Sequence, residues 1–163
     1  MTTMNEPVSP VKIWVDHDAT PGMILEILYR VAQRRQVRVV FVANRWHQHP
    51  KSPWIEGIAV ADGADVADDY IVERCGPGQL VVTADIPLSA RAVEQGALVL
   101  NHRGKLLTAA EVREVLSLRD FHQGLRDAGV ETGGPRAYAS SDRQAFANAL
   151  DRWLAKNVPP AGR

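Results

Sequence analysis

The sequence lacks the features that would place the protein in a membrane or cross-link it outside the cell. Its only cysteine, Cys75, cannot form an internal disulfide, which is compatible with a reducing compartment. The first ten residues, MTTMNEPVSP, have neither the basic nor the apolar segment of a secretory signal, and no apolar run reaches the length of a membrane span. We therefore expect a soluble cytoplasmic protein with no membrane partner.

The sequence also lacks an excess of charge of either sign and three well-known motifs. Nineteen Lys and Arg residues balance nineteen Asp and Glu residues, which argues against nucleic-acid binding through overall charge but leaves a local basic face open. No G-x-x-x-x-G-K-[ST], no G-x-G-x-x-G after the first strand and no G-x-S-x-G is present. These absences disfavour a P-loop, a dinucleotide-binding fold and a serine-hydrolase elbow.

What the sequence does contain is an alternation of short apolar runs with helical patterns. Strands are predicted at residues 11–15, 37–43, 58–60, 80–85 and 97–101, and helices at residues 23–32, 64–75 and 87–96. Capping boxes at Thr108–Glu111 and Ser141–Gln144 predict the starts of two later helices. The alternation predicts one α/β domain over residues 11–156, with a three-layer, mostly parallel sheet flanked by helices. Residues 1–10 and 157–163 are expected to be flexible tails.

Polar side chains follow several of the predicted strands at their carboxyl ends. They are Asp16 and Asp18 after the first strand, Asn44 after the second, Thr83 and Asp85 in the run at 80–85, and Asn101 and Arg103 after the last. In a doubly wound sheet the ligand crevice lies at this edge, so we expect these groups to converge there.

The predicted helix at 64–75 adds three acids to this edge. Asp65, Asp68 and Asp69 fall at positions i, i+3 and i+4 and therefore share one helical face. Crowded carboxylates repel one another unless some are protonated or a cation joins them. Mg²⁺ and Mn²⁺ prefer oxygen ligands and can activate water for displacement at phosphorus. The pattern therefore suggests a divalent-metal site.

Each acid also has an ordinary structural interpretation. Asp16, Asp18 or Asp85 could cap a helix, and the acids of 64–75 could form a solvated face. A similar ambiguity applies to a charge asymmetry along the chain, where residues 30–51 contain six basic residues and no acid while residues 56–73 contain six acids and no base. The basic segment could hold phosphates or simply be solvated. Trp46 and Trp54 could stack on bases or pack, and the His47/His49 pair is only a weak metal signal.

Several stretches resemble the YaiI/YqxD family of bacterial proteins, from about Lys12 to Leu154. They are KIWVDHDATP, VANR, GADVADDYI, VVTADIPLSARAVEQGA, LNHRGKLLT and FANALDRWL. That family is grouped with PIN-like domains, whose better-known members are Mg²⁺- or Mn²⁺-dependent ribonucleases with a cluster of acidic residues. The resemblance implies a PIN-like fold and a possible nuclease activity.

The family's motifs match most of the candidate residues. Both aspartates of D-A-D-A-C-P fall on Asp16 and Asp18, and T-A-D-I-P-L is intact around Asp85. The G-x-D-V-A-D motif falls on Gly63, Asp65 and Asp68, and the G-G-P motif falls on Gly133–Pro135.

Four departures from the patterns stand out. His17 replaces a small residue, Thr20 replaces the family's cysteine and His102 replaces a proline in N-P-R-G. PIN nucleases also carry a further acid just after the position of Asp85, where this chain has Ile86-Pro87.

The leading hypothesis is a ribonuclease-type phosphodiesterase dependent on Mg²⁺ or Mn²⁺, with RNA as its expected partner. Asp16, Asp65, Asp68 and Asp85 would hold one or two ions, with Asp18 as an alternative or supporting ligand. Thr83 and Asn44 would orient water, and Arg103, beside Asn101, would neutralise a phosphate. One alternative is a non-catalytic PIN-like module that binds RNA or protein. Another is a hydrolase of small phosphate esters.

Overall fold

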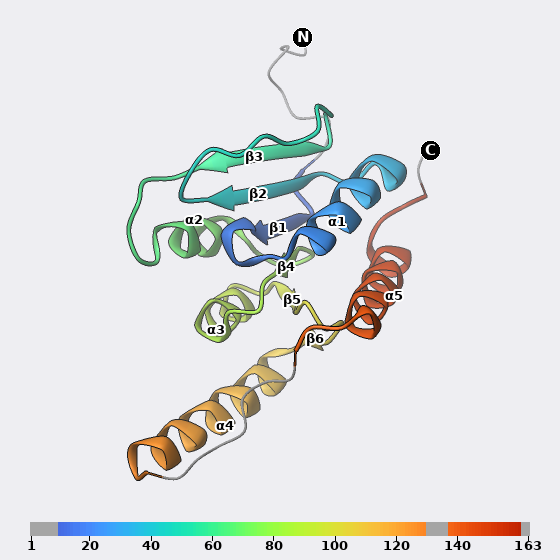
Figure 1. Cartoon of the computed structure of the whole chain (residues 1–163). Helices are drawn as coiled ribbons and strands as arrows, with labels where there is room; N and C mark the ends of the chain where they lie inside the picture. The colour runs from blue at the N-terminus through green and yellow to red at the C-terminus, as the bar shows by residue number, and fades with distance from the viewer. Residues whose placement is uncertain (1–9, 130–136, 161–163) are drawn as a thin grey trace.

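In the part of the chain that the structure describes, six strands form one sheet in the order β3-β2-β1-β4-β5-β6 (Figure 1). The computed structural model describes residues 10–129 and 137–160. All neighbouring strands pair in parallel except β5 and β6, which are antiparallel. The strands are β1 (Ile13–Asp16), β2 (Val39–Ala43), β3 (Ile55–Ala59), β4 (Leu80–Val82), β5 (Leu98–Leu100) and β6 (Leu106–Leu107).

Helices cover both faces of this sheet, which confirms the predicted three-layer α/β architecture. In Figure 1, α1 and α5 lie on one side of the sheet, and α2, α3 and α4 lie on the other. The helices are the one-turn η1 (His17–Ala19), α1 (Gly22–Arg35), α2 (Val66–Arg74), α3 (Ile86–Glu94), α4 (Ala109–Asp127) and α5 (Ser140–Asn157).

The two hydrophobic cores follow from the alternation of side chains along the buried strands. Ile13 and Val15 of β1 pack with residues of α1 and α5, including Leu28 and Phe146. Trp14, between them in sequence, faces the opposite core with residues of α2 and α3. Because both faces of the central strands are covered, their sequences are almost continuously apolar, as expected for a parallel sheet.

Several predicted details are wrong at the element ends. The helix predicted from a Ser141 cap begins at Ser140, and Asp142 accepts from the Ala139 amide instead. The strand predicted at 58–60 lies at 55–59, and β6 was not predicted. The cap at Thr108 is confirmed, since its side chain accepts from Glu111 N.

The strand order places a topological switch point between β1 and β4. Chain connections from β1 proceed towards β2 on one side, whereas β4 is followed by β5 on the other. Ligands of open parallel sheets bind outside the carboxyl ends of the strands at such a point. Asp16 ends β1 there, and Thr83 directly follows β4.

The matched motif Gly133–Pro135 lies outside the described residues. Among residues 10–129 and 137–160, no helix has the length and apolar character needed to cross a bilayer.

Candidate functional site

Asp16 is the buried acid at the switch point. Asp16 is only 7% exposed, although it carries a carboxylate and stands at a strand end. Burial raises its pKa to about 6. A hydrogen bond from Thr83 acts in the opposite direction, and the charges of Asp68, Asp85 and Asp18 raise the pKa further. The fold therefore holds this carboxylate in surroundings that disfavour its ionised form.

Thr83 connects the two strand ends that meet at the switch point. Its fully buried hydroxyl donates to Asp16 Oδ2 at 3.1 Å and accepts from the Asp85 amide at 3.0 Å. One side chain thus orients the Asp16 carboxylate and fixes the backbone that carries Asp85. These contacts show Thr83 orienting a carboxylate, and its predicted role in orienting water stays a prediction.

Asp68 and Asp85 are the other acids brought towards Asp16. Both are half-buried, and burial together with the charges of Asp85 and Asp65 raises the pKa of Asp68. Asp85 also caps α3, because its Oδ1 accepts from Leu88 N at 2.8 Å. The capping role and the clustering of charge therefore coexist at Asp85, since only one of its oxygens faces the helix end.

The donor set suits a hard dication, but it is not gathered as a ready-made three-residue site. Among the described residues, no group of three or more His, Cys, Asp or Glu side chains is arranged to hold a metal ion. Mg²⁺ usually takes one or two carboxylates and completes its octahedron with water and substrate phosphate. A pair drawn from Asp16, Asp68 and Asp85 fits that pattern, and their mutual repulsion gives a reason for a cation to bind.

The remaining predicted acids stand apart from this group. Asp18 faces the loop of residues 44–53, where its carboxylate accepts from Asn44 N at 2.7 Å and meets His47 Nε2 at 3.2 Å. Partial burial would raise the pKa of Asp18, but these contacts lower it. Asp65 is exposed at the start of α2, with a left-handed backbone (φ 67°), and its charge acts on Asp68.

The two predicted asparagines stabilise loops. Asn44 Nδ2 donates to the Ala61 carbonyl at 3.1 Å, joining the segments that follow β2 and β3. Asn101 Oδ1 accepts from the amides of Arg103 and Lys105, which shapes the turn between β5 and β6. A role of either side chain towards substrate stays a prediction.

Arg103 is held beside the site by a buried acid that the sequence did not single out. Its NH1 lies 3.0 Å from Asp142 Oδ2, and Asp142 is only 2% exposed. Much of the basic segment at 30–51 is also paired within the fold. Arg34 pairs with Asp151, Arg38 pairs with Glu56, and Arg35 donates to carbonyl groups of Leu154 and Val158.

Comparison with known proteins identifies the chain's relatives. The profile described as "Uncharacterized BCR, YaiI/YqxD family" matches residues 14–156. The chain belongs to the YaiI/YqxD family. This confirms the resemblance drawn from the sequence motifs.

Relatives in the family are similar along almost their whole length. A UPF0178 protein from Dechloromonas aromatica is 55% identical over 151 residues, which cover 93% of this chain and 100% of the relative. Two others, from Shewanella sp. strain ANA-3 and Saccharophagus degradans, are each 52% identical, over 89% and 91% of this chain and 97% and 98% of their own. No solved structure matches the chain.

Two positions at which the chain departs from the family's pattern touch each other. Thr20, in place of cysteine, and His102, in place of proline, meet with Oγ1 and Nε2 3.3 Å apart. Because the Thr20 hydroxyl donates to the Asp16 carbonyl at 2.6 Å, its oxygen accepts from His102 Nε2–H. The two departures thus form one polar contact beneath Asp16, between residues 82 positions apart.

The third departure, His17, belongs to a group of aromatic rings that includes His47 and His49. His17 stacks on His47 with ring centroids 4.1 Å apart, and its buried Nδ1 has no partner among the described residues. His49 Nδ1 contacts the Tyr29 hydroxyl at 2.9 Å. These contacts secure the loop at 44–53 against the end of β1. The weak histidine signal in the sequence therefore corresponds to packing in this structure.

Replacing Thr83 should loosen the candidate site. Thr83→Val keeps the shape but leaves Asp16 without its donor, so we expect the pKa of Asp16 to rise and stability to fall by about 1–3 kcal/mol. Mn²⁺ affinity should fall about 10- to 100-fold, as for lost supports of ligating carboxylates. Carboxyl ¹³C NMR titration and calorimetry measure these effects. Thr83→Ser is the matched control, and equal behaviour of the two variants would contradict the positioning role.

The contributions of Thr20 and His102 to the free energy of unfolding should be coupled, because the two side chains share a hydrogen bond. A double-mutant cycle with Thr20→Ala and His102→Ala should give an interaction energy of about 0.5–1.5 kcal/mol in urea unfolding at pH 7.5. Additive effects would contradict the contact.

The same pair predicts a dependence on pH. Burial lowers the pKa of His102 from 6.5 to about 4, so its contribution is complete above pH 6.5 and is lost as the pH falls towards 4. His102→Asn should reduce that acid loss in urea unfolding between pH 7 and 4. An unchanged pH profile in this variant would show that His102 is not held neutral.

Proposed function

We propose that the protein is a phosphodiesterase of ribonuclease type that depends on Mg²⁺ or Mn²⁺. The proposal rests on one observation: Asp16 is buried at the switch point with Asp68 and Asp85 close enough for their charges to raise its pKa. A solvated acidic face would leave carboxylates exposed, and a helix cap would give Asp16 a backbone amide partner. Asp16 has neither arrangement, because its side chain is oriented by Thr83.

The residues present suit phosphodiester chemistry in complementary ways. A bound dication would neutralise charge on the phosphate and make a water molecule a better nucleophile. A pair drawn from Asp16, Asp68 and Asp85 would hold it, with Thr83 keeping Asp16 in a fixed orientation. Arg103 lies in the turn after β5, where Asp142 holds it in place, and it would stabilise negative charge on the phosphate.

RNA is supported as the substrate by an exposed aromatic side chain near the same edge. Trp46, in the loop after β2, is 75% exposed, and the neighbouring Arg45 is also exposed. An exposed aromatic ring beside a cation is a stacking platform for single-stranded nucleic acid. The resemblance to PIN-like ribonucleases also supports RNA as the substrate. An RNA substrate agrees with a cytoplasmic location, and so does a protein whose single cysteine has no internal partner.

Cleavage of a labelled single-stranded RNA with Mn²⁺ tests this proposal. Wild type should cleave the RNA, while Asp16→Asn and Asp85→Asn should each lose at least about 100-fold in rate, as expected when a ligand of a catalytic metal is removed. Asp151→Asn, which removes an exposed acid that pairs with Arg34 on the α1/α5 side, should leave the rate unchanged. Equal residual cleavage in all four proteins would refute the proposal.

A non-catalytic module is the second candidate, and two observations favour it. Asp85 already caps α3, and no three ligating side chains of the described chain converge on one point. RNA binding without any Mn²⁺-dependent cleavage and without heat of Mn²⁺ binding would favour this module. Turnover of generic phosphomonoesters without RNA cleavage would favour the small-molecule hydrolase.

A further inference from the structure

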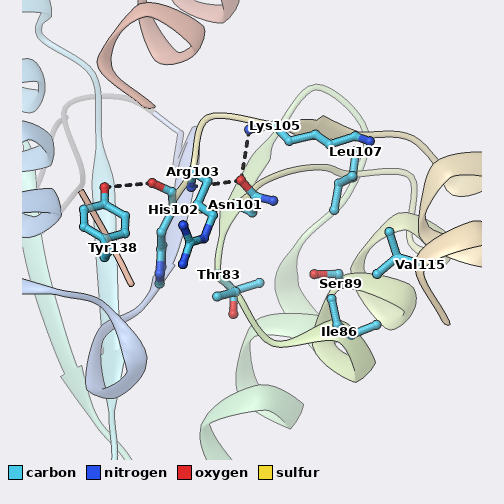
Figure 2. Close-up of a pocket in the computed structure, with 11 residues that line it drawn as sticks. Thr83, Ile86, Ser89, Asn101, His102, Arg103, Lys105, Leu107, Val115 and Tyr138 are labelled. Carbon is cyan, nitrogen blue, oxygen red and sulfur yellow. Dashed lines mark hydrogen bonds between the residues drawn. The ribbon is translucent and has the colours of Figure 1, made fainter. Parts of the chain in front are cut away.

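A pocket of about 380 Å³ opens beside the acidic group, at the carboxyl ends of β4 and β5. Thr83 forms part of its wall, and the same Thr83 hydroxyl donates to Asp16 Oδ2. Figure 2 shows Thr83 between the two sides of the pocket. A ligand in this pocket therefore contacts the residue that orients the Asp16 carboxylate.

The two sides of the pocket have different chemistry. In Figure 2, Ile86 and Val115 lie on one side, and Arg103 and Tyr138 lie on the other. The apolar side comes from α3 and α4, and apolar surface predominates in the lining as a whole. The polar side includes Arg103, while Lys105 of the same β5–β6 turn lies at the rim with its side chain directed towards Leu107 (Figure 2). A ligand that satisfies both sides has a flat or apolar body and a negative charge.

The polar side is rigid before any ligand binds. Arg103 is fixed by Asp142 at 3.0 Å, and the Tyr138 hydroxyl donates to the His102 carbonyl at 2.8 Å. Asn101 Oδ1 accepts two backbone amides of the turn, which fixes the backbone that carries Arg103 and Lys105. Such pre-organisation lowers the entropic cost of binding.

The size of the pocket restricts what can enter. Its volume of about 380 Å³ is near the lower end of the roughly 300–1,000 Å³ found for small-molecule sites. That space suits one nucleoside and excludes a base pair. Proteins that recognise single-stranded RNA use unstacked bases in this way, with aromatic or guanidinium planes beside them.

We propose that this pocket receives one unpaired nucleotide of the substrate strand, so that the protein acts on single-stranded nucleic acid. The inference rests on the proposed function and specifies its substrate. The base lies against Ile86 and Val115, and the phosphate lies on the side of Arg103 and Thr83, with Lys105 at the rim adding positive charge. The pocket thus places a phosphodiester next to the candidate metal site.

Nucleotide binding in the presence of EDTA tests the pocket without relying on the metal site. Calorimetry should show adenosine 5′-monophosphate and uridine 5′-monophosphate binding at least about tenfold more tightly than inorganic phosphate, because only the nucleotides fill the apolar side. Binding of deoxyadenosine 5′-monophosphate reports whether the 2′-hydroxyl contributes. Inorganic phosphate binding as tightly as the nucleotides would overturn the inference.

Two variants locate this binding. Val115→Phe, which fills the apolar side, should weaken binding of adenosine 5′-monophosphate about tenfold. Lys105→Ala, at an exposed rim position that should not disturb folding, should weaken it about two- to fivefold. Lys156→Ala on α5 is the matched control and should bind like wild type. Wild-type affinity in both Val115→Phe and Lys105→Ala would overturn the inference.

Two further measurements separate this inference from the proposed function. Mn²⁺-dependent hydrolysis of bis(4-nitrophenyl) phosphate by wild type tests the carboxylate site alone, because that diester contains no nucleoside. Nucleotide binding in EDTA without this hydrolysis would reject the enzymatic proposal and keep the pocket. A blunt RNA duplex should bind more weakly than a single strand of the same sequence, and equal binding would reject the single-strand assignment.

Discussion

Asp16→Asn should make the metal-free protein more stable at pH 7.5 while abolishing its proposed activity. Burial and neighbouring charges raise the pKa of Asp16 from 3.8 to about 6, which corresponds to a destabilisation of about 3 kcal/mol when the carboxylate is ionised. Asparagine carries no charge and still accepts from Thr83. We therefore expect about 2 kcal/mol of added stability in urea unfolding with EDTA present.

The sign of this effect should depend on pH in a defined way. A raised pKa means that the folded state retains the proton more strongly, so the penalty is absent below pH 3.8 and complete above about pH 6. The stability difference between Asp16→Asn and wild type should therefore disappear on acidification through that range. Protonation of His102 lowers stability as the pH falls over an overlapping range. That loss occurs in wild type and in Asp16→Asn alike, so it cancels when the two proteins are compared at each pH.

Manganese should reverse the order of stability. A ligand that binds only the folded state adds about 2.7 kcal/mol at one hundred times its dissociation constant. Wild type should gain this stability and Asp16→Asn should not. Asp69→Asn is a suitable control because Asp69 is exposed and paired with Arg91, so both effects should be small there. If Asp16→Asn were less stable than wild type in EDTA, this would contradict the conclusion that the fold disfavours the ionised form of Asp16.

Gly104→Ala should be severely destabilising because the turn between β5 and β6 touches the backbone of α5. Gly104 has φ +88°, and a Cβ there would lie 2.5 Å from the carbonyl carbon and oxygen of Ala145. The left-handed backbone and the clash together should cost about 2–5 kcal/mol in urea unfolding. Neither backbone can retreat easily, since Phe146 beside the contact is fully buried.

Gly78→Ala is the matched control for this substitution. Gly78 has φ +82°, but no atom lies within 4 Å of the position that a Cβ would take, so it isolates the backbone strain of about 1–2 kcal/mol. Gly104→Ala should also displace Arg103 and weaken nucleotide binding, whereas Gly78→Ala should not. Equal losses of stability in the two variants would show that the contact with α5 does not constrain the turn.

The sequence predicted the parts of the fold that depend on local pattern. The continuous apolar run at 37–43 indicated a strand covered on both faces, and β2 is fully buried. Parallel strands align their carboxyl ends, so the convergence of Asp16, Thr83 and Asp85 followed from the alternation of strands and helices. The identity of the family followed from motifs in the same stretches and is confirmed by the comparisons.

Contacts between distant residues were beyond the reach of local pattern. β6 contains only Leu106–Leu107 and exists because it pairs with β5. The Arg103–Asp142 pair joins residues 39 positions apart. No periodicity or spacing marks such a contact, because it depends on how α5 packs after the chain has folded.

The same limit explains why the candidate site is smaller than the predicted one. Five acids were expected to share the site, yet Asp18 is engaged by the loop after β2 and Asp65 is exposed at the start of α2. The sequence showed where acids occur, but not which hydrogen bonds compete for them. The metal dependence and the nuclease activity remain predictions that the carboxylate group motivates.

Mn²⁺ titration followed by electron paramagnetic resonance tests the central claim most directly. Hydrated Mn²⁺ gives a strong signal that decreases on binding, so the number of bound ions is counted without any substrate. At pH 7.5 we predict saturable binding to wild type and to Asp151→Asn, and a loss of at least about tenfold in affinity for Asp16→Asn and Asp68→Asn. Free Mn²⁺ throughout the wild-type titration, or equal binding by all four proteins, would contradict the account.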